Sequence, residues 1–213
     1  MKNRWLGAAV LALSVVGGSQ AITVSAHAAL SDDVQQIVTA HAADTDGGVA
    51  LQAEFASFIS KAADPAATAA KMIASLGDVS PVVLASVAGA IDSIDVITPD
   101  ALANAIGRVV ADGGTGADAL SANVISVAQY FSASNRAAAG KGLAIAVASL
   151  KDRPDMAEVA GKIIAQVDVS GLDEVKTAFS EQALEIESAS LQNPTGDNLL
   201  QKTSLLVTTQ SPN

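Results

Sequence analysis

Three acidic side chains near the beginning of the chain have a spacing that could bind a cation. Asp44 and Asp46 lie at the start of a twelve-residue segment, DTDGGVALQAEF, and Glu54 lies near its end. Carboxylate oxygens are the ligands that Ca²⁺ prefers in proteins. The Asp-Gly-Gly sequence inside the same segment is also typical of a simple turn between two helices. The sequence therefore leaves two interpretations open, a calcium site and a plain turn.

The segment resembles the calcium loop of an EF-hand, in which early Asp residues and a final Glu followed by an apolar residue supply oxygens. The resemblance implies that Asp44 and Asp46 are the first ligands and Glu54 the last. The loop is one residue shorter than the motif and lacks the fifth-position ligand. We therefore expect any calcium binding to be weak, at the millimolar level that extracellular modules use. No other cofactor is expected.

Residues typical of catalysis are scarce elsewhere in the chain. His41 is the single histidine after residue 28, and no Gly-x-Ser-x-Gly elbow accompanies it. A histidine at the end of a helix is typical of an interaction with the helix dipole. Glu181, Glu185 and Glu187 could act as paired carboxylates, but their spacing is typical of a solvated helix face. We expect no enzymatic activity, and a hydrolase of unusual design is the alternative.

Composition excludes several further classes of function. The chain has 213 residues, with 22 acidic against 12 basic side chains and a net charge of −10. Such an acidic surface argues against binding to nucleic acid, which requires a basic face. The absence of cysteine excludes disulfides, thiolate nucleophiles and zinc sites built on cysteine.

Residues 1–28 have the pattern of a secretory signal peptide. Lys2 and Arg4 precede an apolar run over residues 6–16, which is too short to span a membrane. Small residues offer cleavage after Ala28, which we favour, or after Ala21. We therefore predict export to the periplasm or the cell exterior, with no transmembrane segment in the mature chain. Loss of the two basic residues would change the net charge from −10 to −12.

Apolar periodicity predicts helices along almost all of residues 29–190, which we expect to form a single all-α domain. Asp64, Ser80 and Thr98 each stand directly before a proline, the combination typical of a helix start. Together with the glycine-rich stops, these signals predict helices near 33–43, 49–63, 66–76, 81–94, 100–111, 118–132, 137–150, 155–167 and 172–190.

The predicted helices form pairs of about 34 residues. The leading apolar residues of successive first helices are Ile37, Met72, Ile106, Leu143 and Val175, which lie 35, 34, 37 and 32 positions apart. This spacing is typical of helical hairpins in a short α-solenoid-like stack. An irregular helical bundle is the alternative. Glycines inside the predicted helices, at positions 89, 107, 140, 142 and 161, would allow neighbouring helices to approach closely.

Residues 191–213 differ from the body, because polar side chains dominate and prolines interrupt them. We expect a flexible tail. The short apolar groups at 199–200 and 205–207 could contact the body or a partner. The sequence as a whole favours an exported scaffold whose partner is another envelope or surface protein, or a second copy of the chain.

Overall fold

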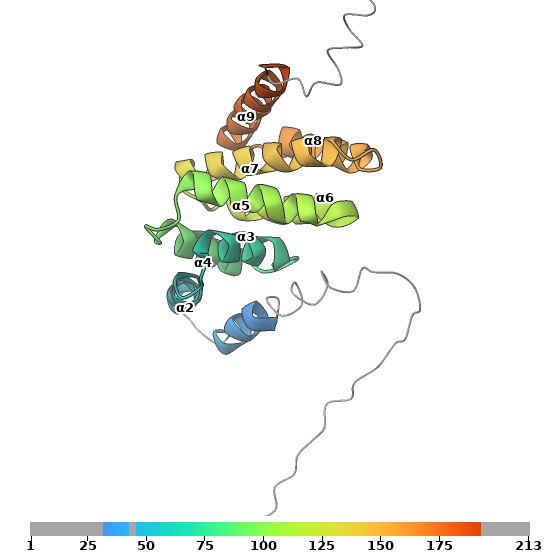
Figure 1. The fold of residues 1–213 in the computed structure, drawn as a ribbon. Coiled ribbons are helices and arrows are strands. Elements are labelled where there is room, and N and C mark those ends of the chain that lie inside the picture. Colours follow the sequence, from blue (N-terminus) through green and yellow to red (C-terminus); the bar gives the residue numbers. More distant parts are fainter. Residues whose placement is uncertain (1–31, 43–45, 193–213) are drawn as a thin grey trace, which may run out of the picture.

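The structure, a computed structural model, describes residues 32–42 and 46–192 (Figure 1). Both predicted cleavage sites and residues 193–213 lie outside the described residues. Every regular element within those ranges is a helix, which confirms the all-α prediction. The helices are residues 32–40, α2 (Val49–Ser60), α3 (Pro65–Ser75), α4 (Pro81–Asp92), α5 (Pro99–Asp112), the 3₁₀ turn η1 (Gly114–Gly116), α6 (Ala117–Ala128), α7 (Ala133–Lys151), α8 (Ala157–Val169) and α9 (Asp173–Gln192).

The helices stack in two rows. In the first row α3 packs against α5, α5 against α7, and α7 against α9. In the second row α2 packs against α4, α4 against α6, and α6 against α8. Figure 1 shows the resulting layers one above another, with α5 beside α6 and α7 beside α8. Each row joins helices about 34 residues apart in the chain, so the arrangement is a stack of hairpins.

The proline-associated helix starts are confirmed. The side chain of Asp64 accepts a hydrogen bond from the Ala67 amide at 3.0 Å at the start of α3. Ser80 and Thr98 accept equivalent bonds at the starts of α4 and α5. Each bond satisfies a backbone donor that the first turn of a helix leaves unpaired. Local sequence therefore fixes where three of the stacked helices begin.

Two glycines allow α5 and α7 to lie close together. A Cβ added to Gly107 would lie 2.7 Å from Ile145, and one added to Gly142 would lie 2.8 Å from the Ala103 carbonyl oxygen. Gly140 has the same role at the contact of α7 with α9, where its Cβ would lie 2.2 Å from the Val175 carbonyl oxygen. The predicted close packing at small residues is thus confirmed at these three glycines, but it is wrong at Gly161 on the exposed side of α8, where an added Cβ would meet nothing within 4 Å.

One helix begins earlier than the sequence predicts. The expected start of α7 was near residue 137, and the helix begins at Ala133. The carboxylate of Asp92, at the end of α4, accepts hydrogen bonds from the Ser132 amide at 2.7 Å and from the buried Asn135 side chain at 2.6 Å. A residue 40 positions upstream therefore caps α7, and this partner cannot be found from local sequence.

Candidate functional site

Asp46, one of the predicted calcium ligands, holds the beginning of α2. Its carboxylate accepts hydrogen bonds from the backbone amides of Gly48 at 3.0 Å and Ala50 at 2.9 Å. The Ala50 hydrogen bond is the largest cause that lowers the pKa of Asp46 below its ordinary value, and the Gly48 bond adds to it. In this arrangement the carboxylate satisfies donors of the first helical turn, as the turn interpretation expects.

Glu54 lies on α2 and forms an ion pair with His41 through its Oε2 and the histidine Nε2. His41 directly follows the helix at residues 32–40, so this contact joins that helix to α2. Asp44 lies outside the described residues. Across residues 32–42 and 46–192, no group of three His, Cys, Asp or Glu side chains could hold a metal ion together. Calcium binding through Asp44, Asp46 and Glu54 stays a prediction.

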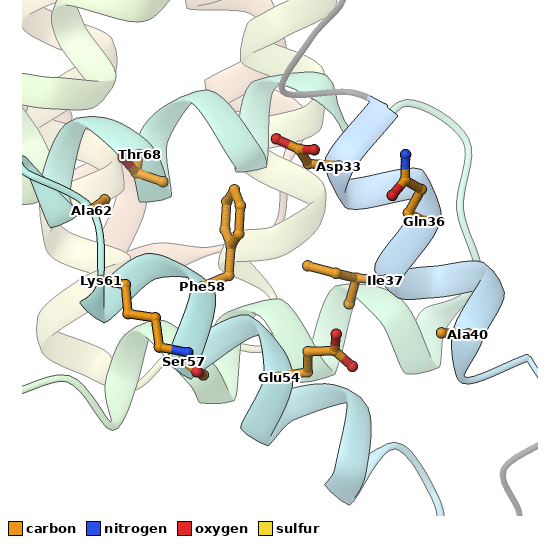
Figure 2. Close-up of a pocket in the computed structure, with 10 residues that line it drawn as sticks. All are labelled: Asp33, Gln36, Ile37, Ala40, Glu54, Ser57, Phe58, Lys61, Ala62 and Thr68. Atoms are coloured by element: carbon orange, nitrogen blue, oxygen red, sulfur yellow. The ribbon is translucent and has the colours of Figure 1, made fainter.

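A cavity of about 770 Å³ opens beside Glu54, between the helix at residues 32–40, α2 and the beginning of α3. Figure 2 shows Phe58 and Ile37 pointing toward each other across it, with Glu54 on α2, Lys61 directly after α2 and Asp33 on the opposite helix. Its wall is therefore apolar in the centre and charged at the rim, with charges of both signs.

The three glutamates considered for hydrolysis lie on α9. Glu181, Glu185 and Glu187 are all exposed, and Glu185 accepts a hydrogen bond from Gln182 at 3.3 Å. They lie on the solvated surface of the helix.

A second candidate site is the exposed side of the first row, which we call the first-helix face. On α5 this side is the stripe of Asn104, Arg108 and Asp112, because the residues between them are buried or nearly so. A groove of about 470 Å³ lies between this stripe and α3. Another, of about 340 Å³, lies between α7 and α9. The face thus carries grooves between successive helices.

Two basic side chains of the first groove have no acidic partner. Lys71 on α3 and Arg108 on α5 both line it, and within the described residues neither makes an ion pair or a side-chain hydrogen bond. In contrast, Lys141 pairs with Asp100 at 3.4 Å, and Arg136 pairs with Glu174 at 3.0 Å. What distinguishes Lys71 and Arg108 is that both line the same groove, although they come from different helices.

Sequence reasoning did not single out Lys71 and Arg108. They lie 37 positions apart, which is close to one repeat. A comparison of successive repeats could therefore have shown that both occupy similar positions. Their proximity depends on α3 and α5 lying side by side, which is a property of the stack.

No protein-family model, curated protein or solved structure matches the chain. None of the described helices is long and apolar enough to cross a membrane.

Proposed function

We propose that the chain is an exported, non-catalytic helical scaffold that binds a protein of the cell envelope or cell surface through its first-helix face. The observation that supports this most is the two-row stack, which leaves exposed side chains on α3, α5 and α9, with one groove between α3 and α5 and another between α7 and α9. Stacked hairpins commonly bind partners along such an extended surface. The cleavable amino-terminal pattern at residues 1–28 supports export.

Polar and small residues dominate this face, which fits a reversible protein contact. The groove between α3 and α5 is lined by Ala66, Ala67, Ala101 and Ala105 together with charged side chains. Of the large apolar side chains that are strongly exposed, Val96 at 71% and Val169 at 83% lie in a loop or at a helix end, whereas Leu184 at 66% lies on α9, one turn beyond Glu181. Small side chains leave room for a partner backbone, and charges at the rim give specificity.

Site-specific cross-linking tests the proposal, because the chain has no cysteine and each introduced thiol is unique. A photoactivatable cross-linker is attached to Asn104→Cys or Thr177→Cys on the first-helix face, in cells that make the protein. The matched controls are Ala122→Cys on α6 and Ala165→Cys on α8, which are exposed in the second row.

We expect the two variants on the first-helix face to form an adduct with the same partner and the two control variants to form none. Adducts confined to the second row, or no adduct from any of the four positions, would contradict the proposal.

A further inference from the structure

We infer that the first-helix face binds an extended segment that carries a carboxylate at one point and a basic side chain about five or six residues away. The carboxylate lies over Lys71 and Arg108, and the basic side chain lies over Asp173 and Glu181. The inference rests on the proposed function and specifies the chemistry of the partner.

The groove between α3 and α5 provides the carboxylate site. Lys71 and Arg108 enter it from opposite sides, and both side chains are exposed. Two carboxylates also line the groove. Asp64 already accepts the Ala67 amide at 3.0 Å as the cap of α3, and Asp112 lies at the far end of α5. The ammonium and guanidinium groups are therefore available to an incoming anion, and a guanidinium can bind a carboxylate through two parallel hydrogen bonds.

The floor of this groove admits a peptide backbone. Alanines of α3 and α5 line the groove, and their short side chains leave room for a peptide backbone between the two helices. Asn104 lies in the same groove and donates its amide hydrogen to the Asp100 carbonyl oxygen at 2.9 Å. This bond fixes the orientation of the amide group and leaves the Oδ1 atom of Asn104 as an acceptor for a backbone N–H.

The charged side chains that line the groove between α7 and α9 are all acidic, whereas those of the first groove are two basic and two acidic. Asp173, Glu174 and Glu181 line the groove between α7 and α9, with alanines again at the floor. Glu174 is already paired with Arg136 at 3.0 Å, whereas Asp173 and Glu181 make no ion pair within the described part of the chain. Thr177 lines this groove and lies two residues after Val175, as Arg108 lines the first groove and lies two residues after Ile106.

Distance sets the spacing of the two charges on the partner. The grooves are two helix-to-helix steps apart, which is about 16–20 Å at ordinary packing distances. An extended chain covers this span in about five or six residues. Between the grooves, Lys141 and Asp100 neutralise each other at 3.4 Å. The face therefore offers the cations Lys71 and Arg108 at one groove and the carboxylates of Asp173 and Glu181 at the other, with an ion pair between the grooves.

Selection from a displayed library of linear twelve-residue peptides tests the inference with the purified full chain. We expect enriched peptides to carry an Asp or Glu about five or six residues from a Lys or Arg. The double variant Lys71→Ala/Arg108→Ala should bind these peptides about tenfold more weakly, as expected for the loss of two charge-assisted contacts. Asp173→Asn/Glu181→Gln should weaken the same peptides, and added salt should weaken binding to the unmodified chain.

A matched control removes two basic residues outside the groove. Lys151→Ala/Lys162→Ala changes the net charge equally and should leave the affinity unchanged, which separates local contacts from overall charge. The inference would be overturned by enrichment of peptides without the paired charges, by the absence of any enriched peptide, or by a loss of affinity in Lys151→Ala/Lys162→Ala as large as that in Lys71→Ala/Arg108→Ala.

Two other occupants would also overturn it, and each has its own signature. A synthetic peptide of residues 193–213 carries Asp197 five positions before Lys202 and so has the same charge pattern; if it competed, the occupant would be the chain's own end, and the assignment to a separate partner would be overturned. A dimer in sedimentation that dissociates in Lys71→Ala/Arg108→Ala would identify a second copy. If Asn104→Cys cross-links to a partner protein but no peptide with the paired charges binds, the proposed function is supported and only the charge pattern is refuted.

Discussion

At Gly140, the lack of a side chain allows α7 and α9 to touch. A Cβ there would lie 2.2 Å from the carbonyl oxygen of Val175, a backbone atom that cannot move aside without shifting α9. We expect Gly140→Ala to lower the free energy of unfolding by about 1–3 kcal/mol, because the crossing becomes overpacked. Urea denaturation followed by circular dichroism measures this loss.

Gly161 on α8 is the matched control for that substitution. It is also inside a helix, but a Cβ added to it meets nothing within 4 Å. Gly161→Ala should therefore stabilise the protein by about 0.5–1 kcal/mol, through the intrinsic helix propensity of alanine. If the two substitutions had effects of the same sign, the close crossing of α7 and α9 would be refuted.

Ionisation of Asp46 should make the free energy of unfolding depend on pH in the acid range. Backbone amides lower its pKa below the ordinary value of 3.8, so its ionised form is favoured in the folded state. The stabilisation that this ionised carboxylate provides is fully present above pH 3.8. It is lost as the pH falls through the lower pKa that Asp46 has in the folded chain. We expect Asp46→Asn to be less stable than the unmodified chain at pH 7 and the difference to narrow at acid pH. A difference that stays constant between pH 7 and the acid range would contradict this role.

The same carboxylate bears on the calcium prediction. Ca²⁺ would compete with the amides of Gly48 and Ala50 for the carboxylate of Asp46, and with His41 for the carboxylate of Glu54. We therefore expect millimolar Ca²⁺ to leave the midpoint of thermal unfolding unchanged. A rise with Ca²⁺ that disappears in Glu54→Gln would instead support the EF-hand-like interpretation.

Individual helices could be predicted from sequence wherever the signal is local. Asp64, Ser80 and Thr98 cap the helices that follow them, as the Ser/Thr/Asp-Pro pattern indicates. The start of α7 could not be predicted, because its cap comes from Asp92 on α4. The presence of Lys71 and Arg108 in one groove could not be predicted either, because it results from the packing of α3 against α5.

The Asp92 contact gives a prediction at the scale of helices. Asp92→Ala removes the acceptor for the Ser132 amide and leaves the buried Asn135 amide without this partner. We expect a loss of about 1–3 kcal/mol in the free energy of unfolding. Asp95→Ala, an exposed position in the loop after α4, should have little effect and serves as the control. Equal stability of the two variants would show that Asp92 does not hold α7.

For the whole molecule, the spacing of apolar residues predicted the repeat, and the structure shows how the repeats pack. Met72, Ile106 and Leu143 are fully buried at equivalent places in α3, α5 and α7. Val96 in the loop after α4 and Val169 at the end of α8 are both strongly exposed. Spacing could not distinguish a stack from an irregular bundle, because that depends on which faces of the helices meet.

Export can be tested on the intact protein. We expect the mass of the protein recovered outside the cytoplasm to correspond to a chain that begins at Ala29, with Ile22 as the alternative start. Mass spectrometry of the intact protein distinguishes the two. Recovery only of a chain that still begins at Met1 would contradict the signal-peptide prediction.

Carboxylate footprinting tests the central claim, that the first-helix face binds the partner, most directly. Exposed carboxyl groups are labelled in the purified chain and in the fraction where the protein occurs naturally, and labelling is compared residue by residue. We expect protection of Asp112, Asp173 and Glu181 on the first-helix face, with unchanged labelling of Glu158 and Asp168 on α8. Equal labelling of both sets in the two samples, or protection confined to α8, would contradict the claim.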